Sequence, residues 1–335
     1  MAARHVLRVI DAHAGGNPTR IIVGGVPRLD GSTVAAQQVD FARRWDHLRT
    51  AVTLEPRGGA LTSSAVLVPP ADPKADVGVF FMEPFGYPAM CGSDTISLVT
   101  ALIETGQIAT NGESATVRLE TPAGLVMADA RMTFSGVESV TFTNVPGFLA
   151  LDEVAVHTAE RGELVVDVAY GGNFYVLVPA RSLNLDLAAD VPSLVGARAK
   201  GVLEAAREQL VVQHPTIPAL NEITHVMVYD EQSDASRDAR VQVVVPPDVL
   251  DRSPCGTGTT ARVAALVAQG RLQIGGSVRH TSLTGQTFTG RALREVAMDS
   301  TLGTEVAITG SGHLIGDGNI YVDDRDPLTY GFSVK

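Results

Sequence analysis

Two stretches of the chain begin alike, Cys91-Gly-Ser-Asp-Thr95 and Cys255-Gly-Thr-Gly-Thr259. Each starts with one of the two cysteines of the sequence, followed by a glycine and a hydroxyl residue. The likeness continues at equal offsets through apolar residues to a closing glycine: Val99, Ala101, Leu102, Ile103 and Gly106 in the first stretch, and Val263, Ala265, Leu266, Val267 and Gly270 in the second. Chance would have to match all of these positions together, so the pattern indicates an internal repeat.

Both stretches have the spacing of a helix of about three turns, with an apolar stripe and a glycine stop. Ser93 and Thr257 stand where a hydroxyl is expected to cap the helix start. Asp94 falls in the first turn, where a carboxylate complements the helix dipole. The sequence therefore predicts two related halves, each with a central helix that carries a cysteine at its N-terminus.

The segments around these helices favour strands, because they are short, rich in β-branched or aromatic residues and mostly bounded by glycine or proline. They are Val77–Met82, Ala115–Leu119, Ser139–Thr143, Leu164–Val168, Phe174–Val178 and Val241–Val245. Asp186–Glu208 is expected to be helical in part, with a break near Pro192. The predicted fold class is α+β with two pseudo-symmetric halves, each a curved sheet around a central helix.

The length of 335 residues suggests two domains. The first half, with Cys91, is expected to cover residues 1–160 together with about 312–335. The second half, with Cys255, is expected to cover residues 161–311.

The chain is acidic, with a formal net charge of −11. An acidic surface repels phosphate backbones and anionic lipids, so nucleic acid and membrane are disfavoured as partners. No apolar run approaches the roughly 18 residues that span a bilayer, and the N-terminus lacks the apolar core of a signal peptide. We therefore expect a cytoplasmic protein. The sequence leaves the oligomeric state open, with a homodimer as one alternative.

The two cysteines are too few to complete a zinc site, and a disulfide is not expected in a reducing compartment. A helix N-terminus lowers the pKa of a nearby thiol and also binds anions such as carboxylates. Two such helix starts placed face to face would suit a free amino acid. The backbone N–H groups of Gly92, Ser93, Gly256 and Thr257 would bind its carboxylate.

In that arrangement the substrate α-carbon would lie between the sulfurs of Cys91 and Cys255. One thiolate would remove the α-proton from one face, and the opposing thiol would deliver a proton to the other face. Hydrogen bonds to the carboxylate would stabilise the carbanionic transition state. The pattern thus predicts racemisation or epimerisation by two catalytic cysteines.

No cofactor or metal is expected. A pyridoxal route needs a lysine in a recognisable setting, which Lys74, Lys200 and Lys335 do not have. The histidines show no metal-ligand spacing. Gly256–Ala261 matches a dinucleotide-binding pattern, but it follows a proline-containing loop and no acidic residue stands about 20 positions later, so nicotinamide binding is disfavoured.

Nearly end to end, the chain resembles the proline racemase family, which includes proline racemases, hydroxyproline 2-epimerases and trans-3-hydroxyproline dehydratases. Asp251-Arg-Ser-Pro-Cys-Gly-Thr-Gly-Thr259 is the most specific motif. The other motifs follow in the family's order: Asp11-Ala-His-Ala-Gly-Gly-Asn-Pro-Thr-Arg20, Glu55-Pro-Arg-Gly58, Met90-Cys-Gly92, Thr121-Pro-Ala-Gly-Leu125, Tyr170-Gly-Gly-Asn-Phe174 and Phe288-Thr-Gly-Arg291.

The resemblance implies a diaminopimelate-epimerase-like fold with the active site between two similar halves. It implies that Cys91 and Cys255 are the acid–base pair and that Asp251 accepts hydrogen bonds from the substrate's ring amine. Two positions depart from the family. Ser93 stands where members usually have a histidine that helps to hold the amine, and Gly59 stands where many members have another histidine.

Three functions remain open. The first is an isomerase for a proline-type amino acid, namely 4-hydroxyproline 2-epimerase or proline racemase. The second is a lyase that dehydrates trans-3-hydroxy-L-proline. The resemblance implies threonine at the second cysteine position in that branch, so Cys255 argues against it. The third is a non-catalytic binding protein, for which two matched thiols at helix starts would be unusual.

Overall fold

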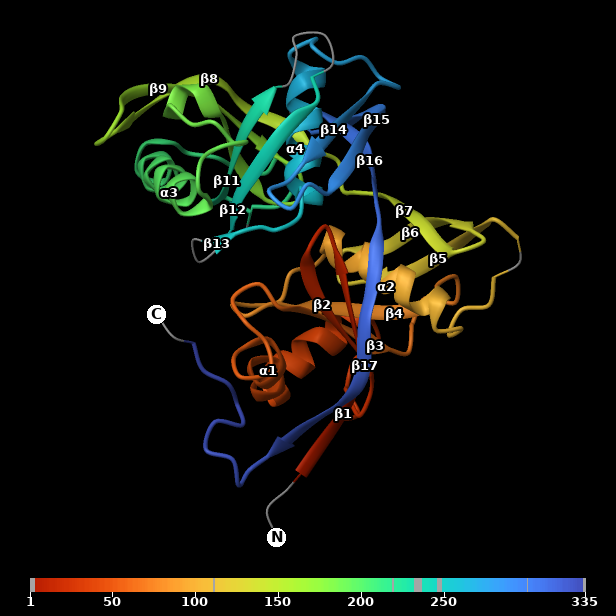
Figure 1. The fold of residues 1–335 in the computed structure, drawn as a ribbon. Coiled ribbons are helices and arrows are strands. Elements are labelled where there is room, and N and C mark those ends of the chain that lie inside the picture. The colour runs from red at the N-terminus through yellow and green to blue at the C-terminus, as the bar shows by residue number, and fades with distance from the viewer. Residues whose placement is uncertain are drawn as a thin grey trace. The chain divides into compact units, whose positions relative to one another are not determined.

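The computed structural model describes residues 4–110, 112–218, 220–231, 237–245, 249–299 and 301–333. The chain divides into two compact units (Figure 1): a first unit of Met1–Phe142 with Gly310–Lys335, and a second unit of Thr143–Thr309. The sequence analysis placed the first boundary near residue 160, whereas the division here lies at Phe142. The difference arises because the strand Phe148–Thr158 pairs along its length with the strand Gly162–Tyr170 of the second unit.

The first unit contains one sheet and two helices. Its elements are β1 (Arg4–Ala14), β2 (Asn17–Gly24), α1 (Val34–Thr53), β3 (Ser63–Val68), β4 (Val77–Met82), α2 (Gly92–Glu104), β5 (Ser114–Thr121), β6 (Gly124–Thr133), β7 (Gly136–Thr143) and β17 (Gly312–Asp323). The strands pair in the order β17-β1-β2-β3-β4-β5-β6-β7. Only β2–β3 and β4–β5 are parallel in this series, and α1 and α2 are the crossover helices that parallel pairs need.

The second unit repeats this arrangement. Its elements are β8 (Phe148–Thr158), β9 (Gly162–Tyr170), β10 (Phe174–Pro179), the 3-10 turn η1 (Ala180–Leu183), α3 (Pro192–Gln209), β11 (Ile223–Glu231), β12 (Ala239–Val245), β13 (Val249–Leu250), α4 (Gly256–Ala268), β14 (Ser277–Thr281), β15 (Thr287–Met298) and β16 (Thr301–Gly310). The strands pair in the order β8-β9-β10-β11-β12-β14-β15-β16, with β13 as an added pair to β12.

Strand by strand, the two series have the same directions. The parallel pairs β10–β11 and β12–β14 occupy the places of β2–β3 and β4–β5, and their crossover helices are α3 and α4. In Figure 1, β17 from the end of the chain lies beside β1 from its start, as β8 lies beside β9. The internal repeat inferred from the two cysteine-containing stretches therefore extends to the topology of both units.

The predicted elements are present. Each of the six expected strands lies within an observed one, and Val77–Met82 has the predicted bounds. In the expected helical segment 186–208, Pro192 is the first helical residue of α3, since its ring is compatible with the first turn but not with the interior of a helix. Both central helices end before the predicted glycines, because Gly106 and Gly270 take φ values of 70° and 69°.

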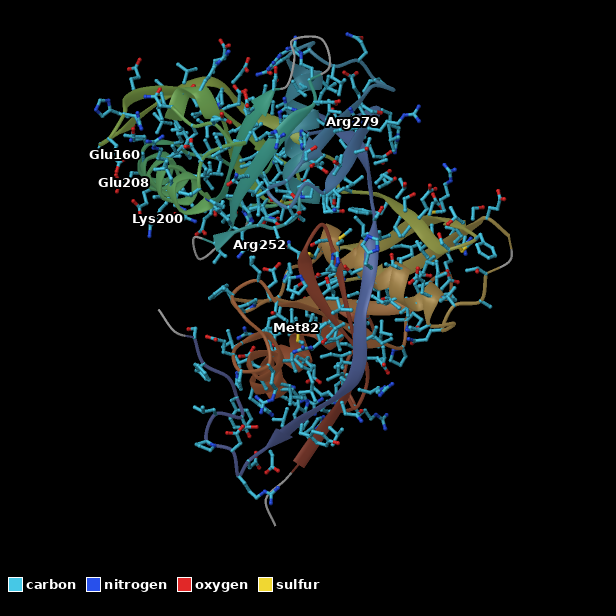
Figure 2. The ribbon with its side chains drawn as sticks, viewed as in Figure 1. Met82, Glu160, Lys200, Glu208, Arg252 and Arg279 are labelled. Carbon is cyan, nitrogen blue, oxygen red and sulfur yellow. The ribbon has the colours of Figure 1, made fainter. Side chains whose placement is uncertain are left out.

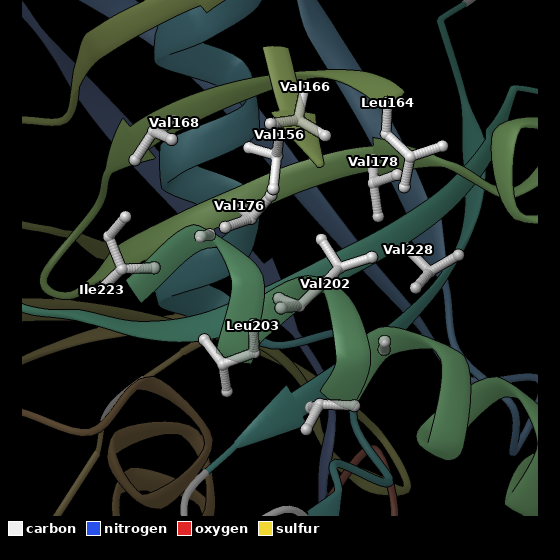
Figure 3. Packing of buried hydrophobic residues seen from close by; sticks show 14 of the residues in the cluster. Val156, Leu164, Val166, Val168, Val176, Val178, Val202, Leu203, Ile223 and Val228 are labelled. Carbon is white, nitrogen blue, oxygen red and sulfur yellow. The ribbon is translucent and has the colours of Figure 1, made fainter. Parts of the chain in front are cut away.

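Each unit has its own apolar core. In the first unit, Phe41 of α1 packs on Phe80 of β4, with ring centroids 5.2 Å apart. In the second unit, Val202 and Leu203 of α3 pack against Val176 and Val228 of the sheet (Figure 3). Burial of each such side chain contributes about 1.5–3 kcal/mol, which fixes the helices on their sheets.

Many charged side chains are exposed at the surface of the two units. Figure 2 shows Met82 inside the first unit, whereas Glu160, Lys200, Glu208 and Arg279 project from the second unit. None of the helices in the described ranges has the length and apolar character needed to cross a membrane.

Candidate active site

The first candidate half-site is the start of α2. Cys91 is the N-cap residue, with an extended backbone (φ −135°), and its side chain is partly exposed. The expectation that Ser93 caps this helix is wrong, because α2 has no side-chain cap hydrogen bond. Ser93 lies one position too far into the helix, at its second residue, and its Oγ lies 3.5 Å from Cys91 Sγ. The Ser93 hydroxyl, which was expected to accept a hydrogen bond from a backbone N–H group, therefore lies beside the Cys91 thiol instead.

A cluster of buried polar side chains around Asp94 holds the start of α2 in place. Thr19 Oγ1 donates a hydrogen bond to Asp94 Oδ1 over 2.7 Å, and Ser63 Oγ donates to the same oxygen. The Thr95 hydroxyl donates to the Cys91 carbonyl over 2.8 Å. Asp94 is fully buried, so in addition to complementing the helix dipole it connects α2 to β2 and β3. The backbone that carries Cys91 is thereby held by hydrogen bonds from two strands.

The second candidate half-site is the start of α4. Cys255 is the N-cap residue, but its backbone has φ 65° and ψ 107°, a conformation that residues with a β-carbon rarely adopt. Its side chain is buried, with 7% exposed. Thr257, also expected as a cap, makes no cap hydrogen bond for the same reason as Ser93, and its Oγ1 lies 3.6 Å from Cys255 Sγ.

Tyr175 of β10 completes the surroundings of this sulfur. Its hydroxyl lies 3.3 Å from Cys255 Sγ and 2.6 Å from Thr257 Oγ1. The sequence analysis missed Tyr175: the quoted motif stops at Phe174, and Tyr175 lies 80 positions before Cys255 in the chain. The sequence pattern of a single segment cannot predict this contact. The contact forms only when β10 pairs with β11 and α4 packs on the sheet.

The loop before Cys255 is held by its own side chains. Asp251 is buried, and its Oδ1 accepts a hydrogen bond from the Ser253 backbone N–H over 2.7 Å. The Ser253 hydroxyl in turn accepts from the Cys255 N–H over 3.1 Å. Asp251, Gly256 and Thr257 thus gather around Cys255 in the second unit, as Gly92 and Ser93 do around Cys91 in the first.

The second glycine of the Cys-Gly-Thr-Gly stretch lies close to side chains of the sheet. A β-carbon on Gly258 would lie 2.7 Å from Met227 and 3.1 Å from the Tyr175 ring. The turn Gly171-Gly172, predicted only as a turn, approaches the same helix: a β-carbon on Gly171 would lie 2.2 Å from the Thr257 carbonyl oxygen. The first turn of α4 therefore packs closely against the Gly171-Gly172 turn and against side chains of β10 and β11.

Burial raises the pKa of both thiols. The pKa of Cys91 is well above its usual value because of desolvation, with added repulsion from Asp94 and Glu83. The pKa of Cys255 is raised to about 12, first by desolvation and then by the charge of Asp251, while hydrogen bonds from Tyr175, the Gly258 N–H and Thr257 act in the opposite direction. The expected lowering by the helix N-terminus is therefore wrong for this structure, since desolvation outweighs the backbone N–H groups.

Neither cysteine forms a disulfide. Within the residues that the structure describes, no three side chains of histidine, cysteine, aspartate or glutamate are grouped so that they could hold a metal ion.

Proteins of known name are similar to this chain over almost its full length. A relative from Brucella anthropi named 4-hydroxyproline 2-epimerase 2 is 39% identical over 336 residues, which cover 99% of each chain. The crystal structure of a hydroxyproline epimerase from Agrobacterium vitis with bound trans-4-hydroxy-L-proline has a TM-score of 0.88 and 34% identity, covering 98% of this chain and 95% of that one.

A more distant likeness concerns the fold alone. A phenazine biosynthesis protein of the PhzF family from Bacillus anthracis has a TM-score of 0.58 at 15% identity, covering 94% of this chain and 99% of that one. Together with the repeated topology of the two units, these similarities confirm the expected α+β fold of the diaminopimelate-epimerase-like type.

The model of one protein family, described as proline racemase, matches residues 9–333. This match confirms the resemblance seen in the motifs from Asp11 to Arg291. It also confirms the expected class of enzyme, an isomerase of the racemase and epimerase type. On the match to the family model and the identity to its relatives, this chain belongs to the proline racemase family.

Proposed function

We propose that the chain is a 4-hydroxyproline 2-epimerase that inverts the α-carbon without a cofactor, with Cys91 and Cys255 as the acid–base pair. The observation that carries this proposal is the equivalence of the two cysteines: each is the N-cap residue of the crossover helix at the same point of a repeated topology. The names of the relatives support the substrate, because proteins similar over their whole length are hydroxyproline epimerases.

In the proposed reaction, each sulfur acts on one face of the substrate. One cysteine, as thiolate, takes the α-proton, and the electron pair of the broken C–H bond moves toward the carboxylate. The other cysteine gives its S–H proton to the opposite face of the carbon. After the reaction, the cysteine that was the thiolate is a thiol and the cysteine that was the thiol is a thiolate, so protons and charge balance. The reverse reaction uses the two cysteines in the opposite roles.

The first turns of the two helices supply the groups that the carboxylate needs. The backbone N–H groups at the start of a helix have no partner within the helix and carry a partial positive charge. Those of Gly92, Ser93, Gly256 and Thr257 are therefore proposed to bind the substrate carboxylate. They stabilise the negative charge that it gains as the α-proton leaves.

Asp251 has a second role in this proposal, besides binding the ring amine. Its charge helps to hold the pKa of Cys255 at about 12, so the thiol keeps its proton at neutral pH. A secondary ammonium paired with Asp251 would offset that repulsion, and the pKa of Cys255 would fall on binding. The substrate would thereby promote its own deprotonation.

Proton NMR in D₂O tests the substrate and the reaction type. Separate samples contain trans-4-hydroxy-L-proline, L-proline and trans-3-hydroxy-L-proline. We expect the α-proton signal of the 4-hydroxy compound to disappear while a new diastereomer forms. Exchange with proline alone would replace the proposal by a proline racemase. Conversion of the 3-hydroxy compound to a cyclic imine would make the chain a dehydratase, and no change in any sample would contradict all three activities.

The remaining expectations from the sequence are proposals of the same kind. We keep a cytoplasmic location, the absence of nucleic-acid and membrane partners, and the open choice of a homodimer. Sedimentation of the purified protein addresses its assembly.

A further inference from the structure

Two hydroxyl groups lie beside the sulfur of Cys255, and the three atoms form a triangle of short contacts. The Tyr175 hydroxyl lies 3.3 Å from Sγ, the Thr257 hydroxyl lies 3.6 Å from Sγ, and the two hydroxyl oxygens lie 2.6 Å apart. An O–O distance of 2.6 Å requires a hydrogen between the two oxygens. One of the hydroxyls must therefore donate to the other, which leaves one to donate to the sulfur.

The geometry and the chemistry of the two hydroxyls decide the direction. Tyr175 is nearer to Sγ, and a phenol is the stronger hydrogen-bond donor because it is more acidic than an aliphatic hydroxyl. The arrangement that follows is Thr257 O–H to Tyr175 oxygen, and Tyr175 O–H to Cys255 sulfur. A donor that itself accepts a hydrogen bond is polarised, which strengthens its own bond.

The ring of Tyr175 is fixed in place. It is fully buried, and the His225 ring packs beside it with centroids 4.7 Å apart. Burial raises the pKa of Tyr175 well above its usual value and lowers the pKa of His225 to about 3. Tyr175 therefore keeps its proton and remains a donor, and His225 stays neutral beside it.

We propose that Tyr175 is a positioning residue that orients Cys255 Sγ and donates a hydrogen bond to the sulfur when its proton has left. The inference rests on the proposed function, in which Cys255 is one of the two acid–base groups. Tyr175 transfers no proton in this proposal: the proton moves between Cys255 and the substrate α-carbon, and the phenol O–H stays intact.

In the described part of the first unit, no tyrosine takes the equivalent place beside Cys91. Among the described side chains, Ser93 is the one within hydrogen-bond distance of Cys91 Sγ. The thiolate of Cys255 thus has a fixed phenol donor where that of Cys91 has a serine hydroxyl. Tyr175 accordingly compensates in part for the deeper burial of Cys255.

Alkylation of Cys255 tests this directly. In the Cys91→Ser background Cys255 is the one remaining thiol of the chain. Iodoacetamide and N-ethylmaleimide, which differ in size, are each reacted with the Tyr175→Phe variant across a range of pH. The matched control is Tyr229→Phe, because Tyr229 packs against the same apolar cluster as Tyr175 and Cys255. Among the described side chains, the hydroxyls that lie within hydrogen-bond distance of the sulfur are those of Tyr175 and Thr257.

A hydrogen bond lost from a charged sulfur raises its pKa by about one to two units, which cuts the thiolate fraction at a given pH about 10- to 100-fold. The nucleophilicity of a thiolate rises with its pKa and offsets about half of this effect on a logarithmic scale. We therefore expect Tyr175→Phe to slow both reagents about three- to tenfold at equal pH. Tyr229→Phe should leave the rates unchanged.

Unchanged or faster alkylation by both reagents in Tyr175→Phe would overturn the inference. Slowing of only the larger reagent would do so too, because it would report access instead of charge. If Tyr175→Phe does not fold, Thr257→Val removes the group that polarises the phenol, and a smaller slowing is expected; no slowing would contradict the inference. Because alkylation needs no substrate, this result is separate from turnover: a slowed thiol in these variants, together with an unmutated chain that does not epimerise 4-hydroxyproline, would contradict the proposed function alone.

Discussion

The helix starts at Cys91 and Cys255 share their sequence pattern and their place in the topology, but their surroundings differ. Cys91 is partly exposed on an extended backbone, whereas Cys255 is buried on a backbone with φ 65°. Ser93 faces one sulfur, and both Thr257 and Tyr175 face the other. Similar first turns can thus hold thiols in different surroundings, because the phenol beside Cys255 comes from β10, outside the repeated stretch.

The layers beneath the helices differ as well. Thr95 and Thr259 stand at equal offsets from the cysteines, yet Thr95 donates to the Cys91 carbonyl, whereas the Thr259 hydroxyl lies 2.9 Å from His280 Nδ1. Arg262, at the offset of Leu98 in α2, donates to His280 Nε2 over 2.9 Å and to Glu231 over 2.7 Å. The pKa of His280 is lowered well below its usual value by burial and by Arg262, so the ring is neutral and its Nδ1–H donates to Thr259.

The largest expected effect is the loss of either thiol. Cys91→Ala and Cys255→Ala should each lower kcat/KM for inversion by about 10²- to 10⁴-fold, the contribution of a positioned acid or base. The two variants should differ in what they retain. Each keeps the base for one face, so each should still exchange the α-proton with solvent for one 2-epimer of 4-hydroxyproline only, and the two variants should act on opposite 2-epimers.

Proton NMR of each pure 2-epimer in D₂O measures this exchange. Exchange of the same 2-epimer by both variants would contradict the assignment of one cysteine to each face. Full inversion by either variant would contradict the pair altogether.

A smaller effect separates the charges that act on the two thiols. Asp251→Asn should speed alkylation of Cys255 about three- to tenfold at neutral pH, because removing the negative charge lowers the pKa of the thiol and raises its thiolate fraction. Glu83→Gln should likewise speed alkylation of Cys91, since the charge of Glu83 raises the pKa of that thiol.

Peptide mass spectrometry after a short pulse of iodoacetamide reads out both cysteines of one sample. Each variant serves as the control for the other. Asp251→Asn should in addition raise KM for the substrate, and an effect of either variant on the other cysteine alone would show that the charges have been assigned to the wrong sulfur.

The smallest expected effect concerns the backbone. At position 255, glycine should be more stable than alanine by about 1 kcal/mol, because a β-carbon is strained at φ 65°. At position 91, where φ is −135°, glycine should be less stable than alanine by about 0.5–1 kcal/mol. Urea unfolding of the four variants measures this, and the same order of stability at both positions would contradict a strained Cys255.

Much of the fold could be predicted from local patterns. The helices α2 and α4, their glycine stops, the six strands and the repeat depend on periodicity and on residues close in sequence. The boundary between the units was harder to predict from the sequence. It depends on the pairing of β8 with β9, which no local sequence pattern encodes.

The site was predictable in its residues but not in its contacts. Cys91, Cys255 and Asp251 could be identified from the motifs that contain them. Tyr175 lies in another segment and contacts Cys255 only because the sheet and α4 pack together. Ser93 and Thr257 were assigned to the backbone because hydroxyl residues commonly cap helices. The cysteines occupy the cap positions instead, and this moves both hydroxyls beside the sulfurs.

The central claim is that two thiols act on opposite faces of one α-carbon. The most direct test is the deuterium content of substrate and product during the first few per cent of conversion of trans-4-hydroxy-L-proline in D₂O. With two opposed thiols, the product should carry deuterium at the α-carbon while the remaining substrate still carries hydrogen. The reason is that one sulfur takes the α-proton and the other sulfur delivers a deuteron that came from the solvent. A product that retains the original hydrogen, or substrate that gains deuterium as fast as product forms, would contradict the central claim.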